Sequence, residues 1–156
     1  MHETSKLTEA RHFLNRMLAE HGNPAAFTHE SSAFMGAARS VLQYARKEAK
    51  LKTGGQDWYD HAMANPLLCF FRDLRNDNVH EVPARPLTKT TTEVAGLLNI
   101  GDDDDETLIP YQHDGSVQQY EFQDRPGEEV TDLSQRYLKA LENLVEDGVA
   151  KGWITG

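Results

Sequence analysis

Arg75 and His80, near the middle of the chain, are of the two side-chain types that together act on phosphate esters. The guanidinium group of arginine is a planar cation that pairs with phosphate oxygens. The imidazole of histidine titrates near neutral pH and can accept or donate a proton during phosphoryl transfer. These two groups suffice for metal-independent cleavage of RNA, because histidine moves the proton while arginine stabilises the charge on the transition state.

The Arg-x4-His spacing is not informative by itself. A second pair, Arg16 and His21, has the same spacing. The residues that follow Arg16 belong to the apolar face of a predicted helix, whereas the polar string Asn76-Asp77-Asn78 follows Arg75 at the end of a strongly apolar stripe. The context therefore favours Arg75 and His80 as the candidate site.

Helix geometry limits how Arg75 and His80 can act on one phosphate. Residues five apart on an ideal helix are rotated by about 140° and do not share a face. The pair converges only if the helix ends between its members or if two copies meet at a symmetric interface. Asn and Asp are poor helix formers, and Pro83 disfavours helix at the residue before it. We expect the helix to fray or end around residues 77–81, with the polar string supplying the end.

The elements that position this pair follow from hydrophobic periodicity. Apolar residues recur at i, i+3, i+4 and i+7 in four regions, which predicts four amphipathic helices. Pro66 interrupts the third region and is expected in the first turn of a fresh segment. Gly and Pro residues end the first two helices. The helices are predicted over residues 4–21, about 26–51, from about 57 to 77–81, and about 128–150.

The pattern changes between the third and fourth helices, where short apolar or β-branched runs predict strands. Asp114-Gly115 is a predicted hairpin turn, because this dipeptide accepts positive φ angles. We expect one mainly α (α+β) domain, a four-helix bundle with a small antiparallel β hairpin or sheet before the last helix. The predicted ranges are 1–156 for the domain, 4–82 and 128–151 for the bundle, and about 87–124 for the β insertion.

The composition predicts a soluble protein of the cytoplasm. No run approaches the ~18 apolar residues that a membrane span needs. The N-terminal residues lack the basic start and apolar middle of a signal peptide. Cys69 is the single cysteine, so neither an intrachain disulfide nor a cysteine-based metal cluster can form.

The net charge of −9 is distributed unevenly along the chain. Residues 1–92 contain 12 basic and 10 acidic side chains, and residues 93–156 contain 4 and 15. The whole is too acidic for generic coating of nucleic acid, which needs a basic surface to displace counterions. A small basic site in the first part is compatible with this distribution. The acidic second part could instead bind a basic partner.

The string LRNDNVHE, residues 74–81, resembles the signature of the HEPN superfamily, Arg-x(4–6)-His with Asn, Asp or His directly after the arginine. The segment ESSAFMGAARSVLQYARKEA, residues 30–49, is similar to the long helix that pairs with the motif helix in such proteins. The resemblance covers residues 1–82 and the last helix. HEPN domains are helical bundles that commonly dimerise and bring two motifs into one cleft. Many are metal-independent endoribonucleases of bacterial toxin–antitoxin, phage-defence or RNA-processing systems, and others are non-catalytic binding or scaffold modules.

The resemblance implies catalytic roles for Arg75 and His80, with Asn76 orienting them, and it implies no cofactor and no metal. The implied partners are a second copy, RNA, and an antitoxin or other protein. In the alternative, a non-catalytic HEPN-like module, Arg75 and His80 are structural or bind a phosphate-bearing ligand. A third interpretation is purely structural: both side chains cap a helix end and pair with neighbouring acids, which are Asp73, Asp77 and Glu81.

Other chemistry-bearing residues do not form a recognisable site. The acidic run DDDDE at 102–106 lacks the alternating ligands and the glycine of a calcium loop, so a solvated loop is expected. Cys69 lies among apolar residues, which is typical of an inert buried thiol. No H-x3-H pair or other compact ligand spacing occurs among five further histidines, which are His12, His21, His29, His61 and His113.

Overall fold

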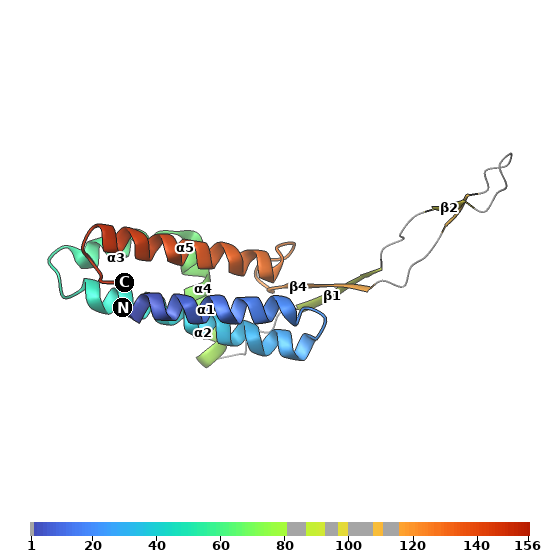
Figure 1. The fold of residues 1–156 in the computed structure, drawn as a ribbon, viewed down its shortest axis with the longest axis horizontal. Helices are drawn as coiled ribbons and strands as arrows, with labels where there is room; N and C mark the ends of the chain where they lie inside the picture. Colours follow the sequence, from blue (N-terminus) through green and yellow to red (C-terminus); the bar gives the residue numbers. More distant parts are fainter. Residues whose placement is uncertain (1, 81–86, 93–96, 100–107, 111–115) are drawn as a thin grey trace.

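The computed structural model is mainly helical, as the sequence predicted (Figure 1). It describes the backbone of residues 2–80, 87–92, 97–99, 108–110 and 116–156, and the side chains of residues 2–74 and 118–156. The helices are α1 (His2–Ala19), α2 (Pro24–Ala49), α3 (Gly55–Ala62), α4 (Pro66–His80) and α5 (Val130–Ala150). Among the described residues, no helix combines the length and the apolar character that crossing a bilayer requires.

Polar side chains set the starts of the long helices. Asn23 caps α2, its side-chain oxygen accepting a hydrogen bond from the backbone N–H of Ala26, and Pro24 takes the first helical position, where no N–H is needed. Glu129 caps α5 by accepting hydrogen bonds from the backbone N–H groups of Thr131 and Asp132. These caps explain why the helices begin where the periodicity does.

The third predicted helical region is two helices, α3 and α4, divided at Pro66 as expected. Asn65 stabilises the start of α4, because its side-chain oxygen accepts a hydrogen bond from the Leu67 N–H at 2.9 Å. α4 ends at His80, within the predicted range of 77–81. The expectation that the polar string ends the helix between Arg75 and His80 was wrong, because the backbone is helical through positions 76–80. The low helix propensities of Asn and Asp cost only tenths of a kcal/mol per residue, which cooperative propagation of α4 overcomes.

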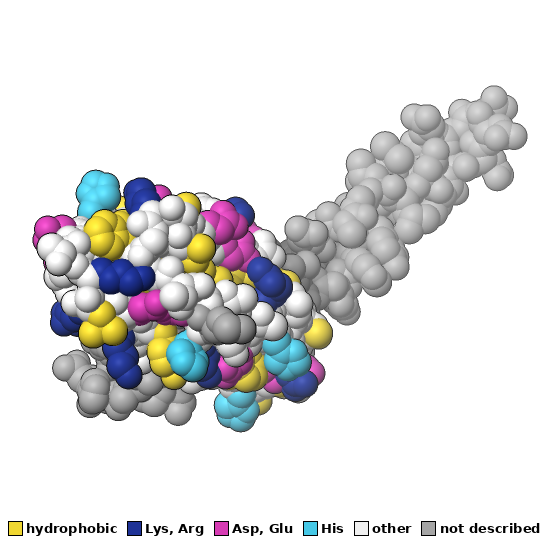
Figure 2. Space-filling model, turned by 60° about the vertical axis from the view of Figure 1, so that its left-hand side comes forward, with side chains coloured by type: hydrophobic (Ala, Val, Ile, Leu, Met, Phe, Trp, Pro, Cys, Tyr) yellow, Lys and Arg dark blue, Asp and Glu magenta, His cyan; other side chains and the backbone are white. Residues whose placement is uncertain are grey.

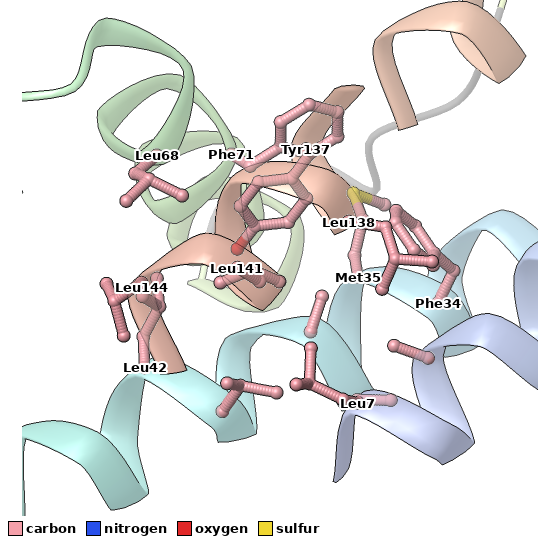
Figure 3. Close-up of a cluster of buried hydrophobic side chains, with 14 of the residues drawn as sticks. Leu7, Phe34, Met35, Leu42, Leu68, Phe71, Tyr137, Leu138, Leu141 and Leu144 are labelled. Carbon is pink, nitrogen blue, oxygen red and sulfur yellow. The ribbon is translucent and has the colours of Figure 1, made fainter. Parts of the chain in front are cut away.

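An aromatic cluster joins α4 to the long helices (Figure 3). The rings of Phe71 and Tyr137 stack with centroids 4.2 Å apart and planes within 2°. Phe34 of α2 meets both rings edge-on, at 6.5 and 6.1 Å. Leu68 and Leu141, which are 2% and 0% exposed, extend this contact along α4 and α5. The cluster places α4 across the bundle with its apolar face toward α2 and α5.

The strands lie between α4 and α5 and pair in two antiparallel sets. They are β1 (Leu87–Thr92), which pairs with β4 (Ser116–Glu121), and β2 (Leu97–Asn99), which pairs with β3 (Leu108–Pro110). Figure 1 shows that β1 and β4 leave the bundle at the end where α1 is joined to α2, with β2 farther out. The predicted turn at Asp114-Gly115 lies outside the described residues. The expectation of a single domain stays a prediction.

Two aromatic residues attach β4 to the bundle. Tyr120 is fully buried and stacks on Phe27 of α2, with ring centroids 3.7 Å apart. Its hydroxyl donates a hydrogen bond to the carbonyl oxygen of His21 at 2.7 Å. Phe122 packs edge-on against Phe71 at 6.0 Å. The base of the β1–β4 pair is therefore part of the same core as α4.

We expect Leu68→Ala to destabilise the protein by about 2–5 kcal/mol, because it leaves a cavity between α4 and α5. Leu51→Ala is the matched control, since it deletes the same atoms from a side chain that is 82% exposed. Urea unfolding followed by circular dichroism measures both. Equal, small losses in the two variants would contradict the packing of α4.

Candidate functional site

The motif residues Arg75, Asn76 and His80 lie in the last two turns of α4, and their side chains lie outside the described residues. The helical backbone separates positions 75 and 80 by about 140° around the axis and about 7.5 Å along it. Of the two arrangements considered above, the end of a helix between them is excluded. The other arrangement, a symmetric interface between two copies, stays a prediction.

Arg72 precedes the motif by one turn of α4 and contributes to a groove of about 480 Å³ between α2, α3 and α4. Positions 75 and 76 follow position 72 at i+3 and i+4, the spacing that places residues one above another on a helix. Five of the lining side chains are cationic. The lining comprises Arg39, Gln43, Arg46, Lys47 and Lys50 along α2, Tyr59 and Asp60 of α3, Met63 after it, and Arg72 of α4.

The sequence of α2 explains why the cations share one side. Arg39, Arg46 and Lys50 are spaced i, i+7 and i+11, which returns to one face of a helix. The buried stripe of the same helix, which includes Val41 and Ala45, lies beside this face and packs into the core. Positive side chains also suit the last turns of a helix, where the macrodipole is negative. The α2 pattern thus supplies four of the five cations of the groove, which are Arg39, Arg46, Lys47 and Lys50.

Tyr59 lies at the floor of the groove and is only 5% exposed. Burial raises the pKa of its hydroxyl, because an ionised phenol is costly in a place that water does not reach. The positive charges of Arg39, Arg46 and Arg72 oppose this shift in the pKa. Guanidinium groups of α2 and α4 therefore both lie close enough to the Tyr59 hydroxyl to influence its pKa.

Arg72 is the one cation of this lining whose guanidinium is paired within the described residues. It donates hydrogen bonds to Asp73, from Nε to Oδ1 at 2.7 Å and from Nη2 to Oδ2 at 3.1 Å. This pair lowers the pKa of the Asp73 carboxyl and raises the pKa of Arg72. The opposite wall carries Asp60, whose carboxylate accepts a hydrogen bond from Gln56 at 2.6 Å.

The sequence analysis did not single out Arg39 or Arg72 as site residues. The available signal was the heptad spacing of Arg39 and Arg46 on the helix before the motif helix. Lys52, which continues the basic end of α2, does not join the groove; its ammonium group donates to the carbonyl oxygen of Gly152 at 2.6 Å. The location of α3 and α4 relative to α2 selects which cations meet.

The other chemistry-bearing residues from the sequence analysis, where the structure describes them, make contacts typical of structural roles. His21 lies 3.4 Å from a Glu129 carboxylate oxygen and edge-on to Tyr120. The Cys69 thiol is half-buried and donates to the Met63 carbonyl oxygen. Within the described residues, no group of three or more His, Cys, Asp or Glu side chains is placed to hold a metal ion. The acidic run at 102–106 lies outside the described residues.

The raised pKa of Tyr59 predicts a pH effect. Native Tyr59 keeps its proton above pH ~10, where the unfolded tyrosine loses it, so this proton contributes stability that is lost as pH rises from ~10 through the native pKa. Tyr59→Phe should reduce the loss by at most about 1.4 kcal/mol per pH unit. Urea unfolding between pH 8 and 11 measures the slope. An unchanged slope would contradict the buried, protonated hydroxyl.

The comparisons with known proteins do not assign the chain to a family. No protein-family model, curated protein or solved structure significantly matches this chain. The resemblance to the HEPN superfamily therefore stays a prediction from the sequence, made on the motif in α4 and the long helix α2.

Proposed function

We propose that the chain is a HEPN-like protein that binds RNA and, as a homodimer, cleaves it without a metal ion. The observation that carries this proposal is the cationic groove, whose described lining includes Arg72, one turn of α4 before Arg75. A groove with five cations suits the phosphates of RNA despite the acidic net charge of the chain, because binding depends on local charge when salt screens distant groups.

In this mechanism the ribose 2′-oxygen attacks the adjacent phosphorus and the bond to the 5′-oxygen breaks. His80 accepts the proton of the 2′-hydroxyl or donates one to the leaving 5′-oxygen. Arg75 holds the scissile phosphate and stabilises the added negative charge of the transition state, and Asn76 orients the pair. The products end in a 2′,3′-cyclic phosphate and a 5′-hydroxyl.

The unbroken α4 is the reason that the proposed nuclease acts as a dimer. One helix directs positions 75 and 80 to different sides, whereas a two-fold axis beside α4 brings position 75 of one copy toward position 80 of the other. The packing of Leu68 and Phe71 supports this arrangement, because it fixes the motif helix on the core. Positioned groups contribute to catalysis only when such packing holds them.

The unbroken α4 also favours a second candidate, a non-catalytic HEPN-like module. In it the same groove binds a phosphate-bearing ligand, and Arg75 and His80 add contacts or structure without cleavage. A toxin–antitoxin, phage-defence or RNA-processing role in a bacterial cytoplasm, with an antitoxin or another protein as partner, belongs to both proposals.

RNA cleavage in the presence of a chelator separates the two candidates. We expect the wild type to cleave single-stranded RNA, and Arg75→Ala and His80→Ala each to lose at least about 100-fold in rate, the scale of one general acid–base or electrostatic group. End-group analysis should find cyclic phosphates. Equal activity of the three proteins would indicate a contaminating nuclease, and no cleavage by any would favour the module.

The chain contains a matched control for these substitutions. Arg16 and His21 repeat the Arg-x4-His spacing, but they pair with Glu30 and Glu129 on the bundle. Arg16→Ala and His21→Ala should therefore keep cleavage close to the wild-type rate. Circular dichroism confirms folding of each variant. A loss as large as that of the motif variants would refute the assignment to Arg75 and His80.

Mixing the two inactive motif variants tests the shared cleft. A hybrid dimer of Arg75→Ala and His80→Ala contains one cleft with an intact Arg75 and an intact His80 from different copies. Each dimer contains two Arg75–His80 pairs, each built from both copies. An equimolar mixture should regain about a quarter of the wild-type activity, because half of the dimers are hybrid and one of the two pairs in a hybrid is complete. A mixture that stays inactive after subunit exchange would argue against a site built from two copies.

A further inference from the structure

The cationic side chains of the bundle fall into two groups. Most are neutralised by an acid on the same surface, and Figure 2 accordingly shows Lys and Arg side chains interspersed with Asp and Glu on the face that it draws. The pairs include Arg11 with Glu142, Arg16 with Glu30, Arg136 with Glu128, and Lys151 with Asp147. This arrangement leaves little net attraction for an anion over most of the surface.

The second group is confined to the groove. Among the side chains that the structure describes, four Lys or Arg residues have neither an acidic partner within 4.0 Å nor a hydrogen bond to an oxygen. They are Arg39, Arg46, Lys47 and Lys50, and all four line the groove. Their charge is therefore not neutralised by a direct partner among the described side chains, and it is concentrated on one helix.

The spacing of the four cations indicates an extended ligand. From Arg39 to Lys50 the stripe covers eleven helical steps, which is about 16 Å along α2. A single phosphate or sulfate touches only one or two cations over such a length. A chain of phosphodiesters presents a charge at each nucleotide and can engage the whole stripe.

The lining also indicates how such a chain is recognised. Tyr59 and Met63 are 5% and 7% exposed, so they provide no open ring or apolar platform on which a base could stack. The exposed groups are three cations, Gln43 and Asp60, and the cations Arg39 and Arg72 are half-buried. Contacts of this kind position a phosphate backbone and do not read base edges.

We propose that the groove binds one strand of RNA through its phosphates, independently of base sequence, with Arg39, Arg46, Lys47 and Lys50 as the binding residues. This inference rests on the proposed function for the choice of RNA. A single strand is favoured because double-stranded RNA is bound across two successive minor grooves, whereas the described site is one linear stripe. The bound strand follows α2 and passes Arg72 toward the motif on α4.

An acidic peptide is the competing ligand and is less well suited. Peptide grooves bind anchor side chains in apolar or aromatic pockets, which supply most of the affinity. The apolar side chains of this groove, Tyr59 and Met63, are already buried in the bundle.

The free protein bears a cost for the unpaired stripe. Arg46 and Lys50 are like charges at i, i+4, an arrangement that destabilises a helix slightly. Both also lie near the C-terminus of α2, where a cation interacts favourably with the helix macrodipole, so neutralising the pair should change the melting temperature little while it weakens RNA binding. If Arg46 and Lys50 served folding alone, neutralising them would lower the melting temperature and leave RNA binding unchanged.

The test is fluorescence anisotropy with labelled 12-nucleotide RNAs at several salt concentrations. Wild type should bind oligo-uridine and a mixed sequence equally, with log Kd rising with log salt at a slope of about 3, since each of four phosphate contacts contributes about 0.7. Arg46→Gln/Lys50→Gln should lower the slope to about 1.4, which corresponds to about 25-fold weaker binding at 0.1 M salt.

The matched control is Arg11→Gln/Arg16→Gln, which removes the same net charge from paired cations on α1. It should bind within about twofold of the wild type, because its arginines were already neutralised. Equal losses in both double variants would mean that only net charge matters and would overturn the site. Tighter binding of the matching duplex, or of a 12-residue poly-glutamate peptide, would also overturn it.

Binding and cleavage together distinguish this inference from the proposed function. If both hold, Arg46→Gln/Lys50→Gln raises KM with kcat nearly unchanged, and Arg75→Ala binds RNA without cleaving it. If the wild type cleaves RNA but Arg46→Gln/Lys50→Gln binds RNA as tightly as the wild type, the assignment of RNA binding to the groove is overturned and the nuclease proposal stands. Groove-dependent binding without cleavage by any protein would overturn the nuclease and leave the groove.

Discussion

The stack of Phe71 on Tyr137 is the contact on which the arrangement of the site depends. It joins the short helix α4 to α5, and Phe34 adds the edge contact to α2. Through it the core determines where Arg72 lies, and Arg72 forms one wall of the groove. Burial of Tyr137 raises the pKa of its hydroxyl well above the ordinary value, which keeps the ring neutral in the core at any physiological pH. The motif helix is thus attached by apolar contacts that do not respond to pH.

The helices could be predicted from the sequence because their apolar residues repeat at the helical period and their ends carry caps. Pro66 marked the division of α3 from α4, and the strands lie within the segments predicted for them. The end of α4 at His80 lies in the range predicted for it, 77–81, but Asn76 to Asn78 do not end the helix earlier, because cooperative helix formation overrides their weak local preferences. Local preference decides a boundary only where packing and hydrogen bonding leave it free.

The groove was hidden from sequence reasoning for a different reason. Arg39 and Arg46 belong to α2, whereas Arg72 belongs to α4, so their proximity depends on tertiary packing. Ion pairing adds a second obstacle, since Arg11 and Arg39 look alike in the sequence and differ in whether an acid lies opposite. Arg11 meets Glu142 on a helix more than a hundred residues away. Net charge by segment was therefore compatible with a basic site in the first part of the chain but did not identify its residues.

The pairing of β1 with β4 has a consequence for how the chain is connected. Leu87 lies opposite Glu121, so the chain leaves the bundle and returns to it at neighbouring points. The two ends of the segment between β1 and β4 are held close together. The entropic cost of bringing the ends of a loop together grows only slowly with the number of residues in the loop. Tyr120 and Phe122 fill the core just where the chain returns. The segment between β1 and β4 can therefore change in length and composition while α2 and α4 keep the geometry of the groove.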